Sequence, residues 1–380
     1  MRLLPRSIAI LFGTLLSILC LVPLAQAFET AAREAILVDF ETGSVLFEKN
    51  ANKPMPPASM SKIMTSYMVF DRLDEGRLSL DDKLPVSEKA WRKGGSKMFV
   101  EVGEEVSVAN LLRGVIVQSG NDACIVLAEG ISGSEQAFAR EMTEKGREIG
   151  LQNSTFTNAT GWPDPDHRMS ARDLATLARR VIEDFPEYYE IYSETEFTWN
   201  DIRQGNRNPL LYRNIGADGL KTGHTEEAGY GLTASAVQNG QRLIMVVTGL
   251  DSVNQRAEEA DRLLSWGFRE FENFNLAQQG EPIDEATVWL GAEDTVPLVT
   301  QKDLVVTLPH AARDELNARI VYDGPVPAPI QEGQSIGTLI LSAPDMPEQE
   351  IQLVAGKSVE QAGLFGRLFA AGKYLAFGSP

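Results

Sequence analysis

The chain has 380 residues, of which 53 are Asp or Glu and 35 are Lys or Arg, so its formal net charge is −18 at pH 7. Such an acidic surface argues against nucleic acid as a partner and against general adhesion to anionic lipid, and an anionic substrate then needs a local cluster of positive charge. The length suggests two domains rather than one.

The first 27 residues have the pattern of a secretory signal peptide. Two arginines flank the start of an apolar run, and Ala25-Gln26-Ala27 gives the small-residue end at which such peptides are cleaved. A retained membrane anchor is the alternative, which this cleavage pattern disfavours. Cleavage removes Cys20 and leaves Cys124 as a single cysteine, so the mature chain forms no intrachain disulfide. The mature chain is therefore expected outside the cytoplasm.

The segments that follow predict a mixture of strands and helices. Residues 34–48 alternate apolar and polar side chains around a glycine turn, as a β-hairpin does. Three apolar helical patterns come next, from Ser59 to about Gly76, over residues 108–118 and over residues 123–131. The last two helices leave only a tight link between them.

The second half of the chain changes character near residue 275. Before that point the patterns predict a helix over residues 171–185, a hairpin over 228–249 and a helix over 255–271. After it, short alternating stretches between Gly- and Pro-rich turns predict a small all-β domain. The expected organisation is a signal peptide (1–27), a main domain (28–274), an all-β domain (275–356) and a final helix (357–380).

The sequence PASMSKIMTSYM, residues 57–68, places Ser59 three residues before Lys62 at the start of an apolar helix. At this spacing the two side chains share one helix face. A lysine there opposes the positive end of the helix dipole, and burial favours its neutral form, which is a base. The alternative is a serine N-cap followed by a lysine that points into water.

Three short motifs stand in order along the chain: Ser59-x-x-Lys62, Ser119-Gly120-Asn121 and Lys221-Thr222-Gly223. With the stretches QSGNDA, GNRNPLL and DGLKTGHTEEAGY, this trio resembles the low-molecular-mass penicillin-binding proteins, specifically the serine-type D-alanyl-D-alanine carboxypeptidases. The resemblance covers nearly the whole mature chain. It implies an α+β fold, in which a penicillin-binding/β-lactamase-like transpeptidase domain (an antiparallel sheet flanked by helices plus a helical subdomain) precedes a small all-β domain and a C-terminal amphipathic helix.

The residue types in the three motifs suit acyl transfer. Ser59 Oγ becomes a nucleophile when Lys62 takes its proton. The Ser119 hydroxyl both accepts and donates, as a proton shuttle to a leaving amine requires, and the Asn121 amide suits the holding of substrate peptide and lysine. Lys221, expected on an edge strand, adds positive charge. The glycine two residues after it lets substrate backbone approach closely.

The resemblance implies further roles around this centre. The oxyanion hole would consist of the backbone N–H groups of Ser59 and His224. Three side chains would contact the terminal carboxylate of the substrate: Thr222, Thr225 and Arg256. A guanidinium suits this task because it binds a carboxylate through two parallel hydrogen bonds.

Three other readings concern single residues. Arg256 has an alternative as the ion-pair partner of Glu259 on a solvated helix. Arg207 is expected to brace the fold and is left outside the catalytic set. Thr160 lies in a loop near the site, at a position where the resemblance implies a histidine in many relatives. This difference is expected to affect the rate of turnover and not the type of reaction.

The expected activity is removal of the terminal D-alanine from peptidoglycan pentapeptide stems through an acyl-enzyme on Ser59, with β-lactams as covalent inhibitors. Alternatives are a D,D-endopeptidase, a β-lactamase, or a catalytically weak wall-binding protein of the same fold. A β-lactamase normally lacks the added β domain, and the intact trio counts against an inert protein. With three histidines and one mature cysteine, no metal or other cofactor is expected.

The last segment, VEQAGLFGRLFAAGKYLAF, gathers its large apolar residues on one side of a helix. Arg367 and Lys373 interrupt the apolar run, and a spanning helix needs about 20 mostly apolar residues. The segment is therefore expected to lie on the outer face of the inner membrane and to make the protein a peripheral periplasmic enzyme. The alternative is a helix packed on its own β domain.

Overall fold

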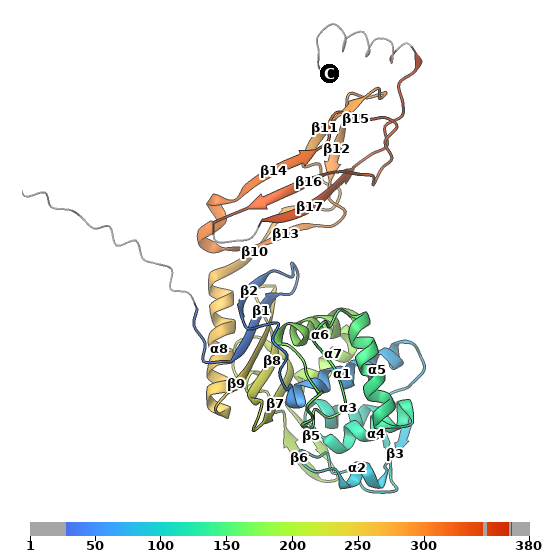
Figure 1. Cartoon of the computed structure of the whole chain (residues 1–380), viewed down its shortest axis with the longest axis vertical. Helices are drawn as coiled ribbons and strands as arrows, with labels where there is room; N and C mark the ends of the chain where they lie inside the picture. The colour runs from blue at the N-terminus through green and yellow to red at the C-terminus, as the bar shows by residue number, and fades with distance from the viewer. Residues whose placement is uncertain (1–27, 345–347, 365, 367–380) are drawn as a thin grey trace, which may run out of the picture.

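The structure, a computed structural model, describes residues 28–344, 348–364 and 366, and two bodies follow one another along its long axis (Figure 1). The first body ends with helix α8 (Val253–Glu270) and combines a sheet with several helices. The second begins with strand β10 (Phe271–Ala277) and is built of strands. The predicted α+β fold with a C-terminal all-β part is confirmed. The predicted signal peptide lies outside the described residues.

The sheet of the first body is antiparallel, and its two predicted hairpins are present. Successive side chains of a strand point to opposite faces. Leu37 therefore packs against α8, whereas Ile36 packs among the helices on the other face. The order across the sheet is β2 (Val45–Lys49), β1 (Glu34–Asp39), β9 (Gln241–Leu250), β8 (Gly229–Gln238) and β7 (Ala217–Thr225). Strand β7 is thus an edge strand, as the sequence predicts for Lys221.

Helices cover both faces of this sheet, with α8 on one side and the helical subdomain on the other (Figure 1). Several of them begin after a serine whose hydroxyl accepts a backbone N–H, such as Ser170 before α6 and Ser252 before α8. The helix predicted over residues 171–185 ends at Asp184, and Pro186 begins the next helix instead of only closing the first.

The remaining elements of the first body complete the helical side. The α-helices are α1 (Lys62–Asp74), α2 (Glu88–Arg92), α3 (Val108–Ile116), α4 (Asn121–Ser132), α5 (Glu135–Glu148), α6 (Ala171–Asp184) and α7 (Pro186–Tyr189). Short 3-10 turns are η1 (Ala58–Ser61), η2 (Glu190–Ser193) and η3 (Pro209–Tyr212). Two small ribbons pair β3 (Lys83–Pro85) with β4 (Glu105–Ser107) and β5 (Glu196–Trp199) with β6 (Ile202–Gly205).

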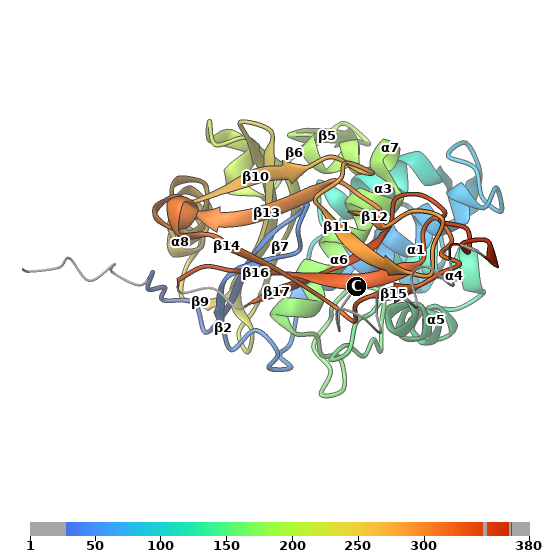
Figure 2. The same cartoon turned by 90° about the horizontal axis from the view of Figure 1, so that it is seen from above.

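The second body has its own apolar core, to which Val296, Leu339 and Leu353 contribute. Strand β10 pairs with β13 (Leu304–Pro309), and a larger sheet lies against them (Figure 2). Its order is β14 (Asn317–Tyr322), β16 (Ser335–Ser342), β17 (Gln349–Ala355), β12 (Thr295–Val299), β11 (Asp284–Trp289) and β15 (Val326–Pro327), and a 3-10 turn, η4 (His310–Glu315), follows β13.

Residues 357–363 are not helical, which corrects the predicted start of the C-terminal helix at residue 357. Val359 is buried and bridges to Ile330, and the Ala362 N–H donates to the carbonyl of Leu290, so this stretch is extended along the β domain. The reason is that Val359 fills the apolar core of the second body. Residues 365 and 367–380, which carry most of the predicted helix, lie outside the described residues. No helix in the described part of the chain is long and apolar enough to cross a membrane.

Candidate active site

Ser59 lies in the η1 turn, which leads directly into α1. It is half-buried, and the other three residues of the turn are buried. Ala58 has a φ of +50°, a left-handed conformation that residues with a Cβ adopt only when their surroundings hold them there. The N-cap of α1 is Ser61 rather than Ser59. The helix-cap alternative for Ser59 is therefore not what the structure shows.

Lys62 is the first residue of α1 and is only 1% exposed. Its Nζ lies 2.7 Å from Ser59 Oγ and donates to the carbonyl oxygen of Thr160 at 2.6 Å. Burial, aided by the positive charges of Arg207 and Lys93, lowers the pKa of Lys62 from 10.5 to about 8. A lysine with this pKa is partly neutral near neutral pH, and the neutral amine can accept a proton from the adjacent hydroxyl.

The second motif connects α3 to α4 and forms another part of the site. Ser119 is buried and has a φ of +59°, and Asn121 begins α4. The Asn121 side-chain amide donates to the carbonyl of Gly94 at 2.8 Å. Gly120 has no room for a side chain, because an added Cβ would lie 2.9 Å from the backbone nitrogen of Met98. The link is thus held tightly against the 94–98 segment.

The third motif lies on the edge strand β7. Gly223 packs directly on the serine turn, since an added Cβ would lie 2.8 Å from the carbonyl oxygen of Pro57. Lys221 is 2% exposed, and its pKa is lowered well below 10.5 by burial and by the charges of Lys62 and Arg207. The glycine expected to admit substrate backbone therefore also serves the contact between β7 and η1.

Arg256 projects from α8 beside the end of β7 and β8. It is 6% exposed, and its guanidinium lies over the ring of Tyr230, which in turn stacks on His224 with ring centroids 3.9 Å apart. Its Nε is buried and has no hydrogen-bond partner among the described residues. The alternative partner, Glu259, pairs with Arg262 instead. Burial lowers the pKa of Arg256.

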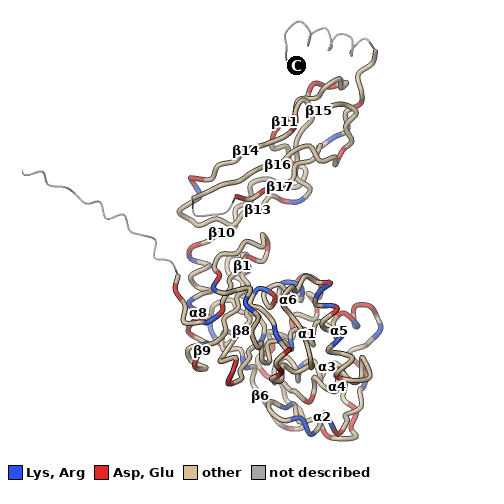
Figure 3. The backbone as a smooth tube through the Cα atoms, in the orientation of Figure 1, with Lys and Arg blue, Asp and Glu red and all other residues tan. Residues whose placement is uncertain are grey.

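The structure adds Arg207 to this group, a residue that the sequence analysis left outside the catalytic set. Its guanidinium hydrogen-bonds to Ser96, and its charge lowers the pKa values of Lys62, Lys221 and Arg256. Arg207 belongs to the GNRNPLL stretch of the family resemblance, but only the folded chain brings its side chain near the three motifs. Acidic and basic residues are otherwise interspersed along the backbone (Figure 3), so this group of cations is a local departure from an acidic chain.

The two threonines of the predicted site differ in their surroundings. Thr222 is buried on β7 between Lys221 and Gly223. Thr225 ends the strand, and its hydroxyl accepts the Ala228 N–H at 3.0 Å, which closes the turn into β8. Among the described residues no three His, Cys, Asp or Glu side chains gather as metal ligands.

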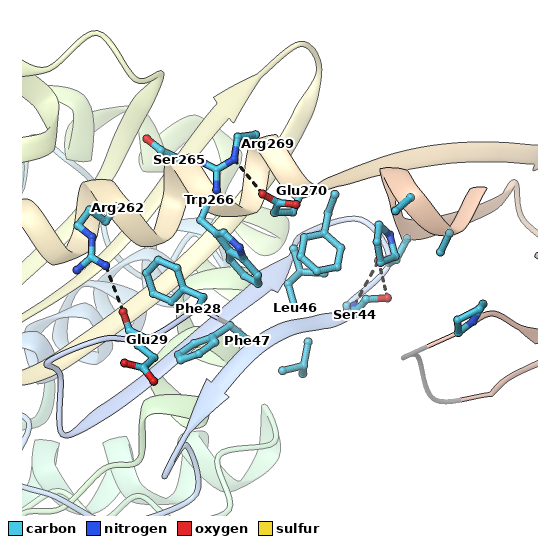
Figure 4. Close-up of a pocket in the computed structure, with 18 of the residues that line it drawn as sticks. Phe28, Glu29, Ser44, Leu46, Phe47, Arg262, Ser265, Trp266, Arg269 and Glu270 are labelled. Carbon is cyan, nitrogen blue, oxygen red and sulfur yellow. Dashed lines mark hydrogen bonds and ion pairs between the residues drawn. The ribbon is translucent and has the colours of Figure 1, made fainter. Parts of the chain in front are cut away.

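A broad groove lies between the two bodies, and the predicted site residues do not line it. Figure 4 shows Phe28, Phe47 and Trp266 clustered at its floor, with Arg262 and Arg269 on the helix beside them. The Trp266 ring lies 5.1 Å from that of Phe28 and 6.2 Å from that of Phe47. This groove is distinct from the Ser59 cluster.

Family models match both bodies of the chain. The model described as D-alanyl-D-alanine carboxypeptidase matches residues 22–252, and the model of the penicillin-binding protein 5 C-terminal domain matches residues 271–361. The chain is 40% identical over 349 residues to D-alanyl-D-alanine carboxypeptidase DacA of Haemophilus influenzae, covering 90% of this chain and 88% of that protein. It is also 40% identical over 352 residues to DacC of Escherichia coli, with the same shares of the two chains.

Solved structures agree with the sequence matches. The crystal structure of penicillin binding protein 5 from Haemophilus influenzae superposes with a TM-score of 0.82 at 39% identity, over 88% of this chain and 98% of that one. The D-alanyl-D-alanine endopeptidase of Escherichia coli is 30% identical over 63% of this chain and 77% of its own length. The endopeptidase match thus covers a smaller share of this chain than the carboxypeptidase matches, which each cover 90%. The chain belongs to the D-alanyl-D-alanine carboxypeptidase family of serine penicillin-binding peptidases.

Proposed function

We propose that this chain removes the terminal D-alanine from peptidoglycan pentapeptide stems, with Ser59 as the nucleophile. Neutral Lys62 takes the Ser59 proton across the 2.7 Å contact, and Oγ attacks the carbonyl carbon of the penultimate D-alanine. The backbone N–H groups of Ser59 and His224 would stabilise the oxyanion. The short Ser59–Lys62 contact and the burial of the lysine support these roles.

The bond between the two D-alanines then breaks, and the leaving amine needs a proton. In this proposal the proton passes from Lys62 through the Ser119 hydroxyl to the amine, while the Asn121 amide binds the substrate backbone. Free D-alanine departs, and Lys62 then takes a proton from a water molecule that attacks the ester carbonyl carbon. The bond from that carbon to Ser59 Oγ breaks, and Lys62 returns the proton to Oγ, which restores the neutral lysine and the free serine. The proposed steps are carried out by side chains and water and require no metal or other cofactor.

The observation that carries carboxypeptidase specificity is the set of buried cations beside β7. Lys221 and Arg256 are nearly fully buried, and neither forms an ion pair with another described residue. Buried charges normally have partners. We infer that the free terminal carboxylate of the substrate supplies the missing negative charge, together with hydrogen bonds from Thr222 and Thr225.

Product analysis tests this proposal. The purified protein is incubated with pentapeptide and, separately, with a cross-linked dimer of stem peptides. Release of free D-alanine from the pentapeptide is the expected result. Cleavage of the cross-link with no release of D-alanine would instead identify an endopeptidase.

Covalent labelling tests the nucleophile. β-Lactams are expected to acylate Ser59, and Penicillin-Binding Protein D2 of Listeria monocytogenes, 30% identical over 63% of this chain, has been solved in an ampicillin-bound form. Intact mass after penicillin treatment should show one adduct on the parent chain and none on Ser59→Ala. An equal adduct on the variant would refute the assignment of Ser59.

We further propose that the mature chain, after cleavage of residues 1–27, works in the periplasm as a peripheral protein of the inner membrane. The A-x-A pattern before Phe28 supports cleavage, and the amphipathic pattern of the C-terminal segment supports attachment to the membrane surface. The all-β domain would then act as a spacer between the membrane and the Ser59 site.

A further inference from the structure

The turn over residues 157–162 is organised by one side chain, that of Asn158. Its Oδ1 accepts hydrogen bonds from the Thr160 N–H (3.1 Å), the Thr160 hydroxyl (2.9 Å) and the Trp162 N–H (3.0 Å). Its Nδ2 donates to the carbonyl of Trp162 at 3.0 Å. Backbone N–H groups only donate and carbonyls only accept, so these partners define which way the amide points.

This turn presses directly on the serine turn. Gly161 has a φ of +75°, and an added Cβ would lie 1.9 Å from the carbonyl oxygen of Ala58. The Thr65 hydroxyl of α1 donates to the carbonyl of Ala159 at 2.7 Å. The turn is therefore held between Asn158 on one side and the start of α1 on the other, with no space in which to shift toward Ser59.

The 157–162 turn carries the carbonyl of Thr160, which accepts a hydrogen bond from Lys62 Nζ at 2.6 Å. A neutral amine has two N–H groups and one lone pair. The carbonyl can only accept, so it must take one N–H of Lys62. The lone pair is then free to face Ser59 Oγ, which lies 2.7 Å away.

We propose that Asn158 is a positioning residue for acylation: by holding the 157–162 turn, it keeps the Thr160 carbonyl on Lys62 and thereby directs the amine lone pair at Ser59 Oγ. This inference rests on the proposed roles of Ser59 and Lys62. In this proposal Lys62 is contacted by the backbone carbonyl of Thr160, and the position of that carbonyl is set by the side chain of Asn158.

A second consequence concerns the protonation of Lys62. A carbonyl acceptor stabilises the charged amine, so its loss lowers the pKa of Lys62 further. The charged or titratable groups that face Lys62 are Asp122 and Cys124 from α4, Lys221 from β7, and Arg207, Lys93 and His167 from the loops. Of these groups His167 contacts the turn itself, because its Nδ1 accepts the Thr157 N–H at 3.3 Å. Burial lowers the pKa of His167 to about 4, so this ring is neutral over the acid limb and a shift in the pH profile reports on the turn.

The experiment measures the second-order rate constant of acylation by a fluorescent penicillin, as a function of pH, on the full chain. Asn158→Ala should acylate on the order of 10²-fold more slowly, as expected for a misplaced catalytic group. The acid limb of its profile should move to lower pH, because the base needs a higher proton concentration to become charged. Asn153→Ala is the matched control, since Asn153 is tied to the fold by its backbone N–H, which donates to Asp173 at 2.7 Å.

Asn158→Asp is the second variant. It retains an oxygen acceptor for the N–H groups of Thr160 and Trp162, so most of the rate should return. Its negative charge near Lys62 should move the acid limb to higher pH, opposite to the alanine variant. This variant also keeps the proposal testable if Asn158→Ala does not fold.

Two outcomes would overturn the inference. One is a parent-like rate and pH profile in Asn158→Ala. The other is a slower rate with an unchanged acid limb in both variants and a lowered melting temperature, which would show a role in stability alone. A parent chain that takes up no penicillin would refute the proposed function itself, so the two failures are distinguishable.

Discussion

Four basic side chains lie in the region of Ser59 and form no ion pair with any described residue: Lys62, Arg207, Lys221 and Arg256. Burial lowers the pKa of all four, the charge of Arg207 lowers the pKa values of the other three, and the charges of Lys62 and Arg256 also lower that of Lys221. The same environment therefore does two things. It makes a lysine available as a base, and it leaves positive charge for an anionic substrate.

The first prediction is the pH dependence of acylation. Lys62 has a pKa of about 8, so the neutral base becomes more abundant as pH rises toward 8, and the acylation rate should rise with it. Arg207→Gln removes a charge that lowers this pKa. The pKa should then rise, and the acid limb of the rate profile should move to higher pH.

The matched control is Arg203→Gln, because Arg203 lies on the neighbouring strand β6 and pairs with Glu196 away from the site. Stopped-flow measurement of penicillin acylation between pH 5 and pH 10 gives the three profiles. An acid limb that stays in place in Arg207→Gln would show that Arg207 does not influence the base.

The second prediction concerns Arg256 and the terminal carboxylate. Loss of a charge-assisted hydrogen bond costs about 1.5–3 kcal/mol. Arg256→Ala should therefore lower kcat/KM for a pentapeptide with a free carboxylate by roughly 10- to 100-fold. The same peptide with an amidated C-terminus should already be poor with the parent and should lose little more with the variant. Equal losses for both peptides would place Arg256 outside carboxylate recognition.

At the scale of elements, the sequence patterns predicted most of what surrounds the site. The β1–β2 and β8–β9 hairpins and helices α1, α3, α4 and α8 follow from apolar periodicity and turn residues. Helix α5 was not predicted; most of its residues are polar, and it lacks the long apolar run that marks α1 and α4.

What the patterns missed depends on chain segments that are distant in sequence. The acceptor for Lys62 is the backbone carbonyl of Thr160, and a carbonyl leaves no mark in the residue type. The role of Arg207 depends on how the GNRNPLL stretch folds back toward Ser96. The left-handed backbone of Ser119 likewise requires the packing of α3 and α4 around it.

The third prediction tests the contact between β7 and the serine turn. Gly223→Ala places a Cβ 2.8 Å from the Pro57 carbonyl oxygen and about 3.1 Å from Met60 Cγ, so either β7 or η1 has to move. Displacement of the strand separates Lys221 from Ser59. Acylation by penicillin should fall on the order of 10²-fold with only a modest change in melting temperature.

Gly146→Ala in α5 is its control. The nearest atom to an added Cβ there is 3.4 Å away, an ordinary contact, and alanine favours a helix over glycine. This variant should acylate at the parent rate. Parent-like acylation by Gly223→Ala would mean that the strand tolerates the extra methyl group and that its glycine serves another purpose.

At the scale of the whole molecule, the two bodies have separate cores and a polar contact between them. Thr42 of the first body hydrogen-bonds to Thr307 on β13, and Gln241 reaches Asn273 on β10. The second body lies at the end of α8, beyond the sheet (Figure 1). Its own core continues through Val359, so the chain remains part of the β domain up to Ala362.

The last prediction follows from where the β domain ends. A truncation after residue 357 would remove Val359 from the core and the hydrogen bond from Ala362 to Leu290, and would destabilise the domain. Removal of residues 363–380 leaves these contacts in place. If the C-terminal segment attaches the protein to the membrane surface, this shorter truncation should move the enzyme into the soluble periplasmic fraction, with unchanged acylation by penicillin and an unchanged melting temperature. Fractionation at high salt, followed by labelling with fluorescent penicillin, makes the measurement. A truncated chain that still sediments with membranes would place the attachment elsewhere, such as in an uncleaved signal peptide.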